Sequence, residues 1–189
     1  EDCPKHLIGD FAFAIWDGAR KRLFCARDHF GVKPFFYARA GQSLVFSNTL
    51  DCVRKHPAVS ATLNDLAIAD FLLFDMKQDP AATAFADIQR LPPAQSLTWS
   101  AEGLKVKRYW TLPEGGEVRY RPAGDYVEHF RELLEIAVAD RLRTSKVVVE
   151  MSGGLDSTAI AVTAKNLLAR QSAPFELHAR MLQLIERET

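Results

Sequence analysis

A loop of six residues, Ser152 to Ser157, carries the side chains in this sequence that are best suited to bind a phosphate group. It reads Ser-Gly-Gly-Leu-Asp-Ser and follows the apolar run Val147 to Val149. Adjacent glycines let a backbone turn tightly and approach a ligand closely, and the free N–H groups at the start of a following helix favour an anion. The predicted pyrophosphate site consists of Ser152, Gly153, Gly154, Leu155, Asp156 and Ser157.

The roles of the polar side chains in this loop differ. Ser152 and Ser157 can donate hydroxyl hydrogen bonds, whereas Asp156 would repel a bare anion, so its predicted role is to bind a Mg²⁺ ion that bridges the phosphates. The alternative is that Gly153-Gly154 is only a turn and Asp156 only a helix N-cap. The GxxxxGK[ST] pattern is absent from the sequence, which disfavours a P-loop NTPase.

The elements around the loop follow the order helix, strand, loop, helix. From Asp125, apolar residues recur at steps of three and four, which predicts an amphipathic helix. The segment 146–151 is predicted as a strand and 157–169 as a second helix that begins near Asp156 or Ser157. This order is typical of the start of a nucleotide-binding α/β domain. The last stretch, 178–189, has an apolar spacing that favours a helix rather than the next strand.

Residues 1–110 have a different, strand-rich pattern. Alternating apolar residues around Asp17-Gly18 and around Gly41 predict an antiparallel meander over residues 9–47. Asn64 is a predicted N-cap for a helix that ends at about Phe74, and the segments around 101–103 form another predicted hairpin. Residues 111–122 contain two prolines and two glycines among charges and are predicted to be a linker.

Composition limits the class of protein. Lys plus Arg and Asp plus Glu are equal at 24 each, and 48% of the residues are apolar, so we expect a globular protein that binds neither nucleic acid nor membrane. Its three cysteines form no CxxC pair, which argues against a disulfide framework or a zinc site, and we expect them to be packing residues. We expect a cytoplasmic protein, because no apolar stretch has the length of a signal peptide or a membrane span.

Three segments resemble the asparagine synthetase family in that family's order. Ser-Gly-Gly-Leu-Asp-Ser resembles its pyrophosphate loop, residues 7–38 are similar to the latter part of its class II glutamine amidotransferase domain, and "RYWTLP" resembles the link between its domains. The resemblance implies ATP and Mg²⁺ as cofactors, a carboxylate substrate that is adenylated, and an amine that attacks it. Arg27 and Asp28 match a turn of this family and are interpreted as a salt-bridged structural loop.

The sequence also departs from the family's pattern. The family's glutaminase nucleophile is a cysteine at the first residue of the mature protein, and no residue here matches it; the setting of Cys3 matches the lead-in to a strand instead. Glu150 falls on a strand that the family buries on both faces, so it should be paired with Arg143 or Lys146, or else mark relaxed selection on the site, which we favour. Asn48 replaces a glutamate found in many asparagine synthetases.

The resemblance implies an α+β fold followed by an α/β fold. Residues 1–110 are expected to form a partial amidotransferase sandwich without its nucleophile part. Residues 123–189 are expected to form the truncated start of a Rossmann-like adenine nucleotide alpha-hydrolase domain, the asparagine synthetase domain.

Three hypotheses about function remain open. The first is an asparagine synthetase, a carbon–nitrogen ligase that is incomplete and inactive as this chain alone. The others are a homologue of the cyclases that close the macrolactam ring of lasso peptides, and an inactive fragment that acts as a binding or scaffold module. The chain is expected to need missing segments or another chain, or to self-associate.

Overall fold

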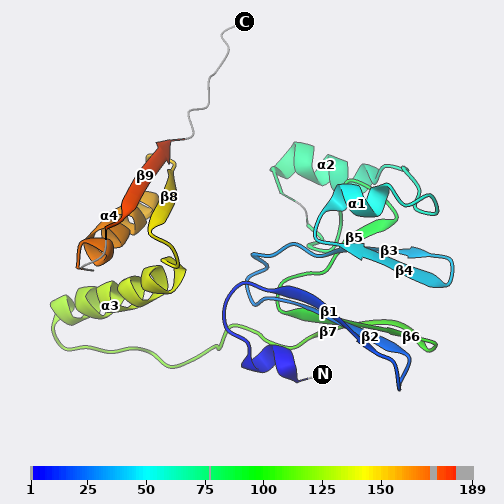
Figure 1. Ribbon diagram of the computed structural model, residues 1–189, viewed down its shortest axis with the longest axis horizontal. Helices are drawn as coiled ribbons and strands as arrows, with labels where there is room; N and C mark the ends of the chain where they lie inside the picture. Colours follow the sequence, from blue (N-terminus) through cyan, green and yellow to red (C-terminus); the bar gives the residue numbers. More distant parts are fainter. Residues whose placement is uncertain (1, 77, 171–173, 182–189) are drawn as a thin grey trace, which may run out of the picture. The chain divides into compact units, whose positions relative to one another are not determined.

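The computed structural model describes residues 2–76, 78–170 and 174–181 and divides the chain into two compact units (Figure 1). Unit 1 comprises Glu1–Glu114 and unit 2 comprises Gly115–Thr189. The division falls inside the segment predicted as a linker, where residues 111–120 form neither helix nor strand.

Unit 1 contains a four-stranded antiparallel sheet with the order β1-β2-β6-β7. Its strands are β1 (Ala12–Asp17), β2 (Arg22–Arg27), β6 (Gln95–Ser100) and β7 (Gly103–Arg108). The predicted hairpins at Asp17-Gly18 and at 101–103 are confirmed. The carboxylate of Asp17 stabilises the first turn, because it accepts a hydrogen bond of 3.0 Å from the backbone N–H of Arg20.

A second antiparallel sheet has the order β4-β3-β5. It consists of β3 (Phe36–Ala40), β4 (Ser43–Ser47) and β5 (Ile88–Arg90). The hairpin around Gly41 is therefore confirmed, but the prediction of one continuous meander over residues 9–47 is wrong. Strand β2 pairs with β6, and the loop after β2 carries the chain to the other sheet.

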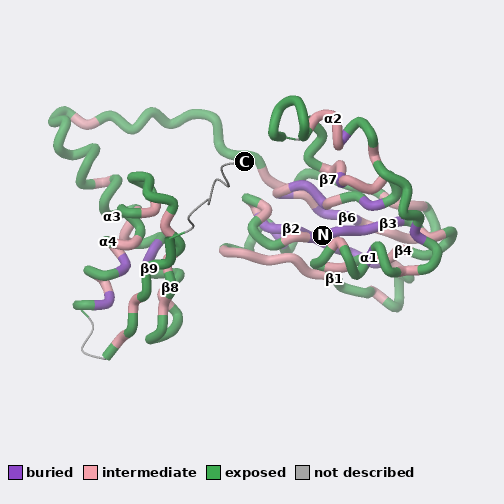
Figure 2. Tube along the Cα trace, turned by 90° about the horizontal axis from the view of Figure 1, so that it is seen from above, coloured by how far each residue is buried: buried purple, intermediate pink, exposed green. Residues whose placement is uncertain are grey.

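The core of unit 1 lies in two layers. Between the two sheets, a cluster of buried residues comes from β2, β3, β6 and the segments beside them: Leu23, Cys25, Phe35, Tyr37, Leu91 and Leu97. On the other face of the second sheet, Phe36, Ala38 and Ile88 pack with Val53 of α1 (Leu50–Arg54) and Val59. Figure 2 shows the buried positions gathered on the central strands. The sandwich of antiparallel sheets therefore buries both faces of β3.

Two further helices belong to unit 1. The short 3₁₀ helix η1 spans Cys3–His6, and α2 spans Asp65–Phe74. The predicted N-cap is confirmed, because Asn64 Oδ1 accepts a hydrogen bond of 3.1 Å from Ala67 N. Helix α2 ends at Phe74, and its C-cap residue Asp75 has a left-handed φ of 54°.

Arg27 is buried at the end of β2 and binds three backbone carbonyls. Its Nε donates to Lys33 O and its Nη1 to Leu91 O, both at 2.7 Å, and its Nη2 donates to Gly31 O. Burial lowers the pKa of this guanidinium. A side chain at Gly31 would collide with it, because a Cβ there would lie 3.0 Å from Arg27 Cζ and 2.8 Å from Pro93 Cγ.

Asp28 is buried beside it and is satisfied by the backbone in the same way. Its carboxylate accepts hydrogen bonds of 2.9 to 3.2 Å from the N–H groups of Phe30, Val32 and Lys33. Within the described residues no ion pair joins Asp28 to Arg27, so the loop is structural but the predicted salt bridge is wrong. We call residues 27–33 the Arg27–Asp28 loop.

Unit 2 contains α3 (Ala123–Arg141), β8 (Lys146–Met151), α4 (Leu155–Ala169) and β9 (Glu176–Met181). The two strands are parallel, and α4 packs against β8 and α3.

The prediction of helical structure from residue 178 onward is wrong as far as Met181, because β9 pairs along its whole length with β8. Residues 182–189 lie outside the described residues. A mixed α/β fold with antiparallel sheets is confirmed, whereas the Rossmann-like domain stays a prediction.

Unit 2 buries little of its apolar surface. In its described part, the buried apolar residues are Val138, Ala164 and Leu168. Large side chains along α3 remain exposed, among them Phe130 at 67% and Ile136 at 67%. None of the helices in the described part of the chain is both long and apolar enough to cross a membrane.

We expect Arg27→Met to destabilise unit 1 by about 3 to 5 kcal/mol, because it leaves three carbonyls without their charged donor. Chemical denaturation followed by circular dichroism measures this change. Arg54→Met is the matched control, since it removes an exposed ion pair with Asp51 and a cation–π contact with Phe85 and should cost about 1 kcal/mol. Equal losses for the two variants would contradict the structural role of Arg27.

The three cysteines are free, and only Cys25 is buried. Burial raises the pKa of the Cys25 thiol to about 12, and only a thiolate is strongly nucleophilic. A thiol reagent at neutral pH should therefore modify Cys3 and Cys52 in the folded protein and reach Cys25 only after denaturation. Peptide mass mapping reports the modified sites; rapid labelling of Cys25 in the folded protein is the contrary result.

Candidate phosphate-binding loop

The loop 152–157 lies between β8 and α4. Strand β8 ends at Met151 and α4 begins at Leu155. Gly153 has a φ of +81°, a left-handed conformation that glycine adopts without steric cost. Gly154 is the N-cap residue of α4, so the alternative that Asp156 is the N-cap is wrong.

The N-terminus of α4 presents unpaired N–H groups. Gly154 provides no side-chain cap, and within the described residues the backbone N–H groups of Leu155, Asp156 and Ser157 have no hydrogen-bond acceptor. The first backbone bond of the helix runs from Thr158 N to Gly154 O at 3.3 Å. Such N–H groups, together with the positive end of the helix dipole, favour an anion.

The two serines that the sequence singled out lie next to each other. Their Oγ atoms are 3.3 Å apart, and Ser157 Oγ accepts from Ser152 N and donates to Gly154 O, both at 3.3 Å. Sequence reasoning missed Thr158, whose Oγ1 donates to the same carbonyl at 2.8 Å. A hydroxyl residue four positions after a helix cap is the signal that could have identified it.

Asp156 is exposed in the first turn of α4. Within the described residues there is no group of three or more potential metal ligands, and Asp156 is the carboxylate of the loop itself. This fits Mg²⁺ better than a structural metal, because Mg²⁺ keeps several waters and is held by one or two carboxylates plus substrate phosphates.

Glu150 departs from the expectation. It is exposed on β8, where exposed and half-buried residues alternate. Neither proposed partner pairs with it, because Lys146 forms an ion pair with Glu176 and Arg143 with Asp140. An exposed carboxylate carries little desolvation cost, so the burial on which both interpretations of Glu150 rested is absent here.

Comparison with known proteins gives the class of each part of the chain. Residues 1–110 match the model of a glutamine amidotransferase domain, and residues 129–180 match that of asparagine synthase. Asparagine synthetase [glutamine-hydrolyzing] 3 of Bacillus subtilis is 36% identical over 95% of this chain and 29% of its own length. Asparagine synthetase [glutamine-hydrolyzing] 2 of the same organism is 30% identical over 82% of this chain and 22% of its own.

The chain belongs to the glutamine-hydrolysing asparagine synthetase family. It spans less than a third of the length of the two relatives named above. A solved structure described as the allosteric regulatory enzyme of purine biosynthesis matches 82% of the chain at 16% identity, with a TM-score of 0.28.

Gly153→Ala should destabilise unit 2 by about 1 to 2 kcal/mol, because an L-residue is strained at positive φ. The strain acts through the backbone alone, since a Cβ at Gly153 would meet no atom within 4 Å. Gly124→Ala is the control: it lies in α3, also in open space, and should stabilise the helix by up to about 1 kcal/mol. Thermal denaturation compares the two, and a neutral Gly153→Ala would contradict the left-handed loop.

Proposed function

We propose that this chain is part of an asparagine synthetase that forms an amide through an acyl-adenylate, and that residues 152–157 hold the pyrophosphate group of ATP. The observation that carries the proposal is the uncapped N-terminus of α4, where free N–H groups follow the left-handed Gly153. Family membership supports ATP as a substrate. The alternatives of a lasso-type cyclase or a scaffold are not favoured by the comparisons.

The proposed reaction places the loop at the leaving group. An oxygen of the substrate carboxylate attacks the α-phosphorus of ATP, the bond between that phosphorus and the bridging oxygen breaks, and pyrophosphate leaves with the bond electrons. Backbone N–H groups of Leu155, Asp156 and Ser157 then stabilise the charge that develops on it. An amine attacks the acyl carbon next and releases AMP. When bound, Mg²⁺ would neutralise phosphate charge, and Asp156 is the residue that would hold it.

The nitrogen source and the location stay proposals as well. Residues 1–110 match an amidotransferase domain, which supports glutamine as the amine donor, and our prediction is that none of Cys3, Cys25 and Cys52 is the glutaminase nucleophile. The exposed apolar face of α3 supports the proposal that further chain, another protein or a second copy covers unit 2. A cytoplasmic location likewise remains our prediction.

Calorimetric titration with Mg-ATP and Mg-pyrophosphate tests the loop. We expect both to bind, each to displace the other, and Asp156→Asn to weaken Mg-dependent binding by about tenfold, equivalent to about 1.4 kcal/mol. Asp125→Asn is the matched control, because Asp125 occupies the first turn of α3 as Asp156 does that of α4.

Two results would count against the proposal. One is the absence of binding by wild-type protein whose circular dichroism shows that it is folded. The other is an equal loss of affinity in Asp125→Asn and Asp156→Asn, which would assign the effect to overall charge.

A further inference from the structure

Three hairpin turns of unit 1 meet at one end of the sandwich and enclose a cleft of about 560 Å³. The turns join β1 to β2, β3 to β4 and β6 to β7, and their tips lie at the right-hand end of unit 1 in Figure 1. The residues that line the cleft include two tryptophans and two cations: Trp16, Trp99, Lys21 and Arg39. This volume is in the range of ordinary small-molecule sites.

Two indole rings contribute the apolar wall. Trp16 and Trp99 belong to one row of cross-strand partners, in which Leu23 lies between them and Leu104 follows Trp99. Leu23 is buried in the core, yet Trp16 is 56% exposed and Trp99 is half-buried. Tryptophan is a large apolar residue that gains by burial, so two indoles at an open cleft indicate a surface for a planar ligand.

Two cations face the same cleft. Within the described part of the chain, neither Lys21 nor Arg39 forms an ion pair. Lys21 has a φ of +46°, which is uncommon for a residue with a side chain, and the turn that holds it is closed by the bonds between Asp17 and Arg20. Among the described residues that line the cleft, the charged ones are Lys21 and Arg39, both cationic.

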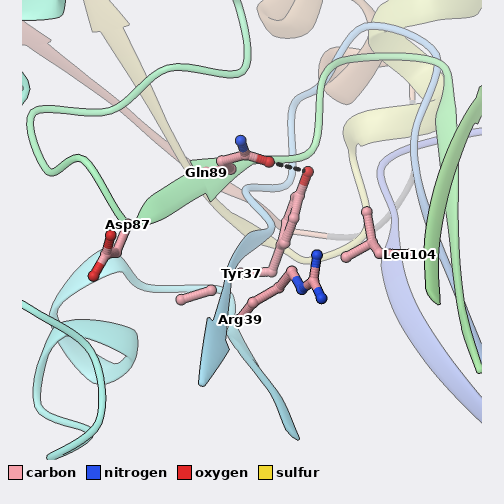
Figure 3. Close-up of a pocket in the computed structure, with 6 residues that line it drawn as sticks. Tyr37, Arg39, Asp87, Gln89 and Leu104 are labelled. Carbon is pink, nitrogen blue, oxygen red and sulfur yellow. Dashed lines mark hydrogen bonds between the residues drawn. The ribbon is translucent and has the colours of Figure 1, made fainter. Parts of the chain in front are cut away.

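Arg39 also borders a second, smaller recess of about 210 Å³. Figure 3 shows its neighbours there: the Tyr37 hydroxyl donates to Gln89 Oε1 at 2.6 Å, and Leu104 and Asp87 also line the recess. Tyr37 is buried, so the strand that carries Arg39 is anchored in the core. Asp87 binds Ser60 N at 3.2 Å and forms no ion pair with Arg39 within the described residues.

We propose that the cleft at these turns binds a planar aromatic anion. The indoles of Trp16 and Trp99 would contact the aromatic ring of the ligand in a stacked or edge-to-face arrangement. Lys21 and Arg39 would bind its anionic group through charge-assisted hydrogen bonds. A nucleoside monophosphate and an aromatic carboxylate share this chemistry. The site does not depend on residues 152–157 and adds a ligand that amide formation does not require.

The indole N–H signals in the NMR spectrum of the ¹⁵N-labelled protein test this site. The chain has three tryptophans, and Trp110, which packs on His29 and Phe30, is the internal reference. Titrations use AMP and phenylacetate as the two sources of the anion, with adenosine and phenylacetamide as their neutral counterparts. Single Trp→Phe variants assign the signals.

We expect at least one of the two anions to shift the signals of Trp16 and Trp99 saturably while Trp110 stays in place. Its neutral counterpart should bind about tenfold more weakly, as should the anion to Arg39→Gln or Lys21→Gln, whereas Lys55→Gln, a substitution of an exposed lysine on another face, should bind normally. AMP alone identifies a nucleotide site, and phenylacetate alone a carboxylate site.

The proposal is overturned by no shift with either anion up to about 10 mM, a concentration that would reveal millimolar affinity. It is equally overturned if the neutral compounds bind as well as the anions, since the cations then contribute nothing. Movement of all three indole signals together would indicate a general effect and would also reject it.

Discussion

The fold of unit 1 depends on the buried guanidinium of Arg27. A charge can remain inside a protein only if donors and acceptors replace its water, and Arg27 meets this requirement with three carbonyls from the loop after β2 and from the segment after β5. Asp28 adds three backbone bonds, and its own N–H and C=O bind Phe11 and Ala94. The Arg27–Asp28 loop therefore connects both sheets, and the chain crosses from one sheet to the other in this loop.

This crossing has a direct result for the surface of the unit. Because β2 pairs with β6 while β3 joins a separate sheet, three hairpins lie with their turns at one end. The tryptophans and cations of the cleft come from three hairpins that are far apart in sequence, and the packing of the two sheets brings them together. The loop of unit 2 differs, since its chemistry is contained in six consecutive residues and the start of one helix.

The sequence predicted best those features that local interactions determine. The Asn64 cap, the end of α2 near Phe74 and the turns at residues 17–18 and 101–103 each depend on a few neighbours, as does Gly153. Prediction failed where a distant partner determines the secondary structure. Residues 176–181 form strand β9 because β8 pairs with them, and the apolar spacing of residues 178–181 does not indicate that pairing. Glu150 was expected to be buried by analogy, but in this structure only alternate residues of β8 are partly buried. The cleft at Trp16 and Trp99 was missed because nothing in either segment shows that they lie in one row.

The close approach at Gly31 limits how the sequence can change over time. A methyl group there would meet both the Arg27 guanidinium and the ring of Pro93, so a larger residue at 31 would require a shorter one at 27 and a displaced chain at 93. The three positions are separated by up to 66 residues in the sequence. A larger residue at 31 should therefore be tolerated only together with changes at 27 and 93, although position 93 is far from the other two in the chain.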